Sequence, residues 1–281
     1  MLYFHVIDGL ILLSLSIVLG GLFGSFATAL IYRLPRGIPI AFGDKSAQGG
    51  DKNGAARSYC TQCKHQLSFF DLIPFLSYLC LRGRCRYCKK SYGSGYFFVE
   101  LSCIVLTLAV LSTFGLTLHA AILIITIPVI LALFVIDLEH LILPDKLVAS
   151  LLVMGLGAKL LIPYLSGALP ASGIVMAFVS VMINGLIFAT VAWLIGFLFS
   201  KILKKDALGL GDVKFYAAAG VWLGLPLLPI FMMVSGVLGV MHGGYCRLAH
   251  KDPIFPFGPS LILSLVICYI FKDMFLLYFY E

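Results

Sequence analysis

Long apolar stretches alternate with short polar turns along most of the chain. Each stretch is close to the roughly 20 residues that a helix needs to cross a bilayer, and none shows the alternation typical of a strand. The pattern therefore predicts an all-α polytopic membrane protein with about eight transmembrane helices. They lie at about 5–32, 97–115, 118–136, 141–163, 172–199, 213–225, 226–243 and 256–279, and the sixth is the shortest.

The first apolar stretch has no basic segment before it and no small-residue cleavage site. It is therefore expected to be a retained helix and not a cleaved signal peptide. Within it, Gly20 and Gly24 stand four residues apart. This small-xxx-small spacing is typical of close helix–helix packing in membranes, so a packing face is predicted here and not a glycine-rich cofactor loop.

The charged residues predict the orientation. With eight spans, one side of the membrane holds the loop at 33–96 and every Lys and Arg except Lys159 and Lys272. The positive-inside rule makes this side cytoplasmic and both termini external. Hydrophobic residues make up 61% of the chain and charged residues 12%. The net charge of +7 is thus explained by topology and by attraction to the anionic lipid bilayer, and nucleic-acid binding is not indicated.

The loop at 33–96 is the only sizeable polar region. Its 43–57 segment is rich in Gly, Lys and Ala without periodicity, which predicts a flexible insertion. Two C-x-x-C pairs follow, formed by Cys60, Cys63, Cys85 and Cys88. Such pairs suit one tetrahedral Zn²⁺ with four thiolates, and four protein ligands indicate a structural site. His65 is an alternative ligand, and free or redox-active thiols are the alternative interpretation.

These observations divide the chain into three predicted parts. Residues 1–32 form a first transmembrane helix, and residues 33–96 form a cytoplasmic loop with the Cys₄ zinc site. Residues 97–281 form a seven-helix membrane core.

Two aspartates stand at the cytoplasmic boundary of predicted spans. Asp137 ends the third span and Asp212 opens the sixth, so a bundle can bring them together. An ionisable side chain at a membrane boundary is costly and commonly functional. Two carboxylates that share one proton form an acid/base pair able to activate water against a peptide bond. Gly209 and Gly211 predict a tight turn with space beside Asp212 for an extended peptide.

Other interpretations of these carboxylates stay open. Each could be a solvated helix-end charge, which the helix dipole would favour for Asp212. Glu139 and Asp145 are rival candidates for the same role, and Lys214 is a candidate charge partner of Asp212. A proton-coupled transporter would use the aspartates as carriers, although the outer halves of the spans hold almost no ionisable residues. A non-enzymatic adaptor would leave the aspartates without a role.

The order and spacing of several motifs resemble the bacterial type IV prepilin peptidases over about residues 20–262. Besides the cysteine pairs, the matching pieces are GSFATALIYRLPRG at 24–37, YFFVEL at 96–101, IDLEHLILPD at 136–145, GLGDVK at 209–214 and PFGPSL at 256–261. The set is specific, although no single motif is.

The resemblance implies a membrane aspartyl protease of the bacterial inner membrane. Such enzymes remove a short basic leader from type IV prepilins or type II secretion pseudopilins, cutting after a glycine at the cytoplasmic face. The family's catalytic pair falls on Asp137 and Asp212. Many members then methylate the new N-terminal residue with S-adenosylmethionine. For that step Glu100, at the cytoplasmic end of the second span, is the candidate residue for orienting the substrate amine.

Departures from the family pattern fall in the N-terminal half. Ala27-Thr28 stands where members often have Leu-Asn, Gly95-Tyr96-Phe97 departs from a common S-x-R-Y-P, and Lys89 replaces a frequent glycine. The family associates this half with methyl transfer. A peptidase without methyltransferase activity is therefore the alternative.

Overall fold

The computed structural model describes residues 2–38, 60, 62, 63, 65, 66, 68, 76–91, 94–204, 208–250 and 255–280. It is 81% helix, and the described residues contain no strand; an isolated bridge joins Arg84 and Ser91. The predicted all-α class is thereby confirmed. The 43–57 insertion lies outside the described residues.

Within the described residues, six helices are long and apolar enough to cross a membrane. The first four are α1 (Leu2–Arg33), α3 (Gly95–Phe114), α4 (Leu118–His140) and a span that joins α5 (Asp145–Leu156), a π-helical turn (Gly157–Leu161) and α6 (Ile162–Leu165). The other two contain α7 (Ile174–Leu203), after a 3₁₀ turn at Ala171–Gly173, and α9 (Leu228–His250), after one at Leu225–Leu227. The loop region holds the short α2 (Leu76–Leu81).

The predicted number of eight spans is not confirmed, because two stretches differ from simple spans. Helix α8 (Leu210–Leu223) has 14 residues. At 1.5 Å per residue it is about 21 Å long, short of the roughly 30 Å apolar core of a bilayer. Helices α10 (Gly258–Ile270) and α11 (Lys272–Tyr280) meet at a bend of 73°, and counting them as one span gives seven.

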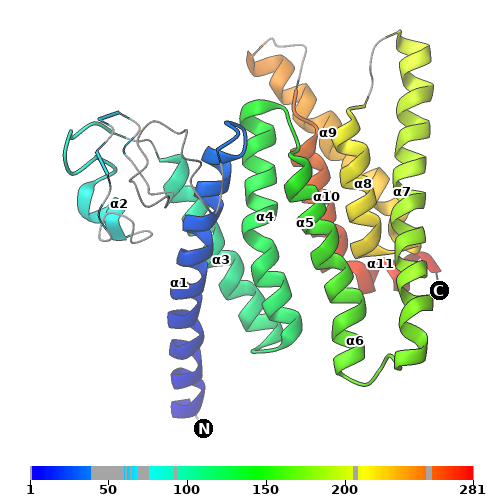
Figure 1. Ribbon diagram of the computed structural model, residues 1–281, viewed down its shortest axis with the longest axis horizontal. Helices are drawn as coiled ribbons and strands as arrows, with labels where there is room; N and C mark the ends of the chain where they lie inside the picture. The colour runs from blue at the N-terminus through cyan, green and yellow to red at the C-terminus, as the bar shows by residue number, and fades with distance from the viewer. Residues whose placement is uncertain are drawn as a thin grey trace. The chain divides into compact units, whose positions relative to one another are not determined.

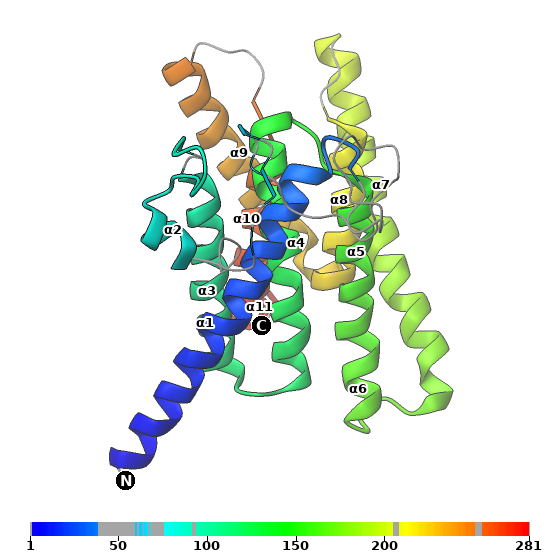
Figure 2. The same ribbon diagram turned by 60° about the vertical axis from the view of Figure 1, so that its left-hand side comes forward.

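The chain forms two compact units, Met1–Ala132 and Leu133–Glu281, and the division falls within α4. In the first unit, α1 lies alongside α3 (Figure 2). A Cβ at Gly20 would lie 2.5 Å from the Cα of Ile104, and one at Gly24 would lie 2.7 Å from the Cα of Glu100. The packing face predicted from the glycine spacing is therefore confirmed, because only glycine allows the two backbones to approach this closely. The predicted three-part division remains a prediction.

In the second unit, α8 is the central helix. It packs against α5, α7 and α10, and Figure 1 shows α5, α8 and α7 side by side. Gly220 brings α8 close to α7, because a Cβ there would lie 2.7 Å from the Asn184 carbonyl oxygen. The Trp222 indole N–H donates to the Leu151 carbonyl oxygen at 2.8 Å, which ties α8 to α5. These contacts hold the C-terminal half of α8 against α7 and α5.

Candidate functional site

Asp137 lies near the C-terminal end of α4, and its side chain is 5% exposed. Its Oδ2 atom accepts a hydrogen bond of 2.9 Å from the backbone N–H of Gly258, the first residue of α10. The first N–H groups of a helix have no partner within the helix, and the helix dipole places partial positive charge there. The start of α10 is therefore a favourable and directional site for this buried carboxylate.

The contact requires glycine at position 258. A Cβ at that position would lie 2.5 Å from Oδ2 and 2.7 Å from the carboxyl carbon of Asp137. The segment before it is anchored on α9, where Gly239 faces the ring of Phe257 and Gly243 faces the ring of Phe255. Two small residues one turn apart on α9 thus hold the start of α10 against Asp137. Sequence reasoning used PFGPSL only as a motif and missed this role of Gly258.

Asp212 lies in the first turn of α8 and is half-buried. The backbone N–H of Gly209 donates to its Oδ2 at 3.3 Å. Gly209 has an ordinary extended backbone with φ of −70°, so the turn needs no left-handed residue there. A Cβ on Gly209 would lie 3.3 Å from Oδ2 of Asp212. A side chain at position 209 would thus crowd the carboxylate, and the predicted space for an extended peptide remains a prediction.

The structure brings the two carboxylates into one neighbourhood. Gly211 lies against Leu143, since a Cβ there would be 3.4 Å from the Leu143 Cβ. This contact holds the first turn of α8 beside the segment that follows α4. The charge of Asp137 acts on Asp212. Each carboxylate lies at the start of a helix, Asp137 beside α10 and Asp212 in α8, and the electrostatic effect of one reaches the other.

The rival carboxylates have other surroundings. Asp145 accepts hydrogen bonds of 2.8 and 2.9 Å from the Lys214 ammonium, and both side chains are largely exposed. The proposed pairing of Lys214 with Asp212 was therefore wrong, because Lys214 reaches across to the start of α5. Glu139 is 58% exposed and lies 3.9 Å from the His140 ring. Among the four, only Asp137 is buried.

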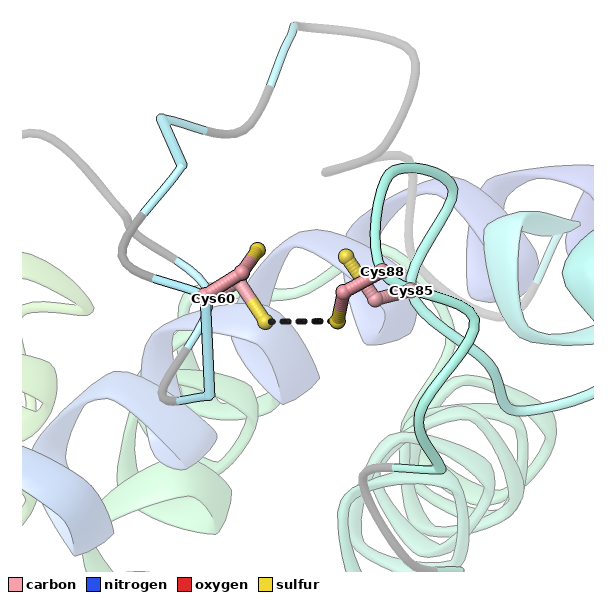
Figure 3. Close-up of side chains that lie close together, drawn as sticks. Cys60, Cys85 and Cys88 are labelled. Carbon is pink, nitrogen blue, oxygen red and sulfur yellow. Dashed lines mark hydrogen bonds between the residues drawn. The ribbon is translucent and has the colours of Figure 1, made fainter.

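The four cysteines of the two C-x-x-C pairs come together in the first unit. Their sulfur atoms all lie within 4.8 Å of one another, and the Cys60 and Cys88 sulfurs are 3.9 Å apart (Figure 3). Four thiolates at about 2.3 Å from a tetrahedral Zn²⁺ would be about 3.8 Å from one another. The cluster could thus hold a metal ion, and its dimensions are compatible with zinc.

The backbone of both pairs supports this cluster. The Cys60 N–H donates to the His65 carbonyl oxygen at 2.9 Å, and the Cys85 N–H donates to the Lys90 carbonyl oxygen at 2.9 Å. The backbone N–H of Cys63 directed at the Cys60 sulfur lowers the pKa of that thiol to about 7. A metal binds the thiolate, so the lower pKa favours binding. His65 stacks on Tyr87 with ring centroids 3.7 Å apart, and the four-sulfur cluster does not include it.

Glu100 lies in the second turn of α3, in the first unit, and is half-buried. Its Cα, Cβ and Cγ all lie close to the position where a Cβ would project from Gly24 of α1. The α1–α3 contact therefore fixes the stem of this side chain.

Two family models match the chain. The model of the bacterial peptidase A24 N-terminal domain matches residues 18–114, and the model of the type IV leader peptidase family matches residues 123–244. The first match thus lies within the first unit, and the second match contains Asp137, Asp212 and Gly209. No solved structure matches the chain.

Relatives are similar over most of their length. The prepilin leader peptidase/N-methyltransferase of Pseudomonas putida is 31% identical over 273 residues, covering 90% of this chain and 88% of the relative. The protein of the same name from Vibrio cholerae is 29% identical, covering 88% and 91%. That from Legionella pneumophila is 34% identical, covering 77% and 73%.

Proposed function

The chain belongs to the type IV leader peptidase family, and from that premise we propose that it is a membrane aspartyl endopeptidase acting on prepilins or pseudopilins. It would remove the short basic leader by cutting after a glycine. The observation that carries the proposal is the pair of carboxylates held at the starts of α10 and α8, with the charge of one acting on the other.

The chemistry needs one ionised and one protonated carboxyl group. The ionised group takes a proton from water while the water oxygen bonds to the peptide carbonyl carbon, and the protonated group gives its proton to the carbonyl oxygen. The tetrahedral intermediate then collapses, the C–N bond breaks, and a carboxyl proton passes to the leaving amine nitrogen. Because the two groups titrate as a pair, we assign neither role to Asp137 or Asp212 alone.

The glycines beside the carboxylates support this role. At Gly209 and Gly258, the position of a missing Cβ lies within 3.3 Å of a carboxylate oxygen. The backbone can therefore approach each carboxylate closely, and each N–H fixes the direction of an acceptor lone pair. Such fixed donors reduce the reorganisation needed at the moment of reaction.

We place the carboxylates at the cytoplasmic face of the bacterial inner membrane. The basis is the distribution of Lys and Arg, of which only Lys159 and Lys272 fall on the other side of the predicted eight-segment path. A prepilin whose basic leader stays in the cytoplasm would then bring its scissile bond to the same face, with its apolar stem in the bilayer.

The cysteine cluster is proposed to hold one structural Zn²⁺ through Cys60, Cys63, Cys85 and Cys88. Its four sulfurs lie within 4.8 Å of one another, and four thiolate ligands would complete the coordination of Zn²⁺ and leave no position for a reacting water. The metal would bring together two short segments that the described backbone joins through few hydrogen bonds.

The second activity in the relatives' name is methyl transfer. We propose it for this chain with Glu100 as the residue that holds the freed amine. S-adenosylmethionine, when bound, supplies the methyl group to an amine that has lost its proton. A carboxylate at the start of α3 is suited to orient that amine and to accept its proton.

The test of this function is incubation of the purified chain with a candidate prepilin in detergent or liposomes. Mass spectrometry of the product's N-terminus should show loss of the basic leader after a glycine. Added S-adenosylmethionine should increase the product's mass by one methyl group. An intact prepilin after prolonged incubation would contradict the peptidase, and a cleaved but unmethylated product would make the chain a peptidase alone.

A further inference from the structure

An apolar groove of about 340 Å³ opens in the second unit, among α4, α9 and α10. Residues from all three helices line it, among them Phe134 and Leu138 from α4, Leu238 and His242 from α9, and Pro259 and Leu263 from α10. Its size lies at the lower end of the range for pockets that bind small ligands. It is large enough for one bulky apolar side chain together with part of a neighbouring residue.

The groove adjoins the Asp137 carboxylate on two sides. On α4, Asp137 is three residues from Phe134 and next to Leu138, so it lies near the same helix face. On α10, Pro259 directly follows Gly258, whose N–H holds the carboxylate. On α9, the charge of His242 acts on Asp137. A peptide with its scissile bond at Asp137 would therefore have a neighbouring side chain within reach of the groove.

The lining residues indicate which substrate side chain enters the groove, one from the leader or one from the stem. Apart from the His242 ring and the hydroxyl groups of Tyr245 and Ser260, the lining is apolar, and it contains no carboxylate. A basic leader residue would find no counter-charge there and would lose its hydration. An apolar residue of the stem would lose water-exposed surface at no electrostatic cost. The groove thus suits the stem side and not the leader side.

We propose that this groove is the subsite for the apolar side chain that immediately follows the scissile bond of the prepilin. The inference rests on the proposed function and adds to it a determinant of substrate preference. We expect size selection, because the hydrogen bond between Asp137 of α4 and Gly258 of α10 lies beside the groove, and widening the groove at that point would displace one of these two residues.

The test is a change of size preference. Leu238→Trp would fill the groove from α9, and Val240→Trp is the matched control, because Val240 lies two residues away on α9, is 77% exposed and does not line the groove. Two prepilins are compared, with Leu or Ala directly after the scissile bond. Leu238→Trp should lower the ratio of kcat/KM for Leu over Ala at least about tenfold, since one extra methylene in a pocket already discriminates by such a factor. Val240→Trp should leave the ratio unchanged.

The ratio is the deciding measurement, because a variant that is merely damaged loses both substrates equally. An unchanged ratio in Leu238→Trp would overturn the inference alone. Failure of the wild-type chain to cleave either prepilin would overturn the proposed function and this inference with it.

A second measurement keeps the native groove intact. A prepilin with a photo-reactive benzoylphenylalanine directly after the scissile bond is bound to the Asp212→Asn variant, and the cross-linked peptides are mapped. Cross-links should fall within 134–138, 238–245 or 259–263. Cross-links only elsewhere, with lipid acyl chains recovered on the groove residues, would identify the groove as a lipid site and overturn the inference.

Discussion

At the scale of single residues, the main feature is that each candidate carboxylate is held by a backbone N–H. Asp137 is bound by Gly258 and Asp212 by Gly209, and both glycines leave no room for a side chain. Rotation of either carboxyl group is thereby restricted by a neutral backbone donor. A Lys or Arg partner would favour the doubly ionised pair, which cannot supply the proton that peptide hydrolysis needs.

The first prediction concerns the carboxylates themselves. Asp137→Asn and Asp212→Asn should each reduce prepilin cleavage at least about a thousandfold, and the double variant should lose little more, because the two groups act as a unit. A carboxamide still accepts the glycine N–H but cannot exchange a proton, so the fold should persist. Cleavage is measured with purified protein, and Glu139→Gln and Asp145→Asn serve as controls that retain activity. Normal cleavage by either Asp→Asn variant would refute the assignment.

A second prediction concerns Gly258. Gly258→Ala would place a Cβ 2.5 Å from Oδ2 of Asp137 and should displace that carboxylate. A shift of about 1 Å in a catalytic group costs roughly a hundredfold in rate, so cleavage should fall by about that factor. Gly236→Ala is the matched control, because a Cβ at this α9 position meets nothing within 4 Å. If Gly258→Ala cleaves as fast as Gly236→Ala, the N–H contact does not position the carboxylate.

At the scale of elements, the cysteine pairs form a local unit whose parts are short. The second pair sits in a tight turn, where the Lys89 N–H donates to the Cys85 carbonyl oxygen at 2.9 Å and Lys89 has a φ of 59°. A non-glycine residue in this conformation carries backbone strain. A glycine at this position would remove the strain, so a metal held as proposed would help to stabilise a turn that is strained in this chain.

The third prediction is that the purified chain carries about one zinc per molecule. Replacing Cys60 and Cys63 with Ser should release the metal and increase proteolysis between residues 58 and 92. Cys80→Ser is the control, because Cys80 is an exposed free cysteine of the same region and lies outside the cluster. The metal is measured by elemental analysis. Protein prepared without chelators and free of zinc would count against the site. Chelation should impair cleavage only through stability or substrate docking.

Helix α8, which carries Asp212, is shorter than a membrane-spanning helix. Its 14 residues are mostly buried against α5, α7 and α10, so its length is set by packing and not by the thickness of a bilayer. Asp212 lies in its first turn, before the buried part of the helix begins at Phe215. The apolar pattern predicted a membrane span here, because a helix buried among other helices and a helix buried in lipid both consist mainly of apolar residues.

At the scale of the whole molecule, the two candidate activities fall in different compact units. Glu100 and the cysteine cluster belong to Met1–Ala132, whereas Asp137 and Asp212 belong to Leu133–Glu281. The two family models divide the chain in nearly the same place, at 18–114 and 123–244. Peptide cleavage and methyl transfer should therefore be separable by substitutions.

The fourth prediction tests this separation. Glu100→Gln should retain cleavage and lose methylation of the product, measured by mass spectrometry with S-adenosylmethionine present. The carboxamide keeps the packing against Gly24 but cannot hold an ammonium group by charge. Glu139→Gln is the matched control, since it removes an exposed carboxylate and should affect neither activity. A parallel loss of cleavage and methylation would make Glu100 a structural residue.

Much of this arrangement was accessible from the sequence, and the remainder depended on contacts between distant segments. The helical class, the close α1–α3 packing and the grouping of the four cysteines followed from local pattern and spacing. The hydrogen bond from Gly258 did not, because it joins residues 121 positions apart. The pairing of Lys214 with Asp145 was missed for the same reason, since the two residues are separated by 69 positions and proximity along the chain pointed to Asp212.

The separation between Asp137 and Gly258 has a consequence for biogenesis. Asp137 is synthesised when barely half of the chain has been made. The Gly258 N–H that binds its carboxylate follows 121 residues later. A nascent or C-terminally truncated chain would contain both aspartates and yet lack the donor that orients one of them. On the proposed function, we therefore expect chains that end before α10 to lack proteolytic activity even though they contain both aspartates.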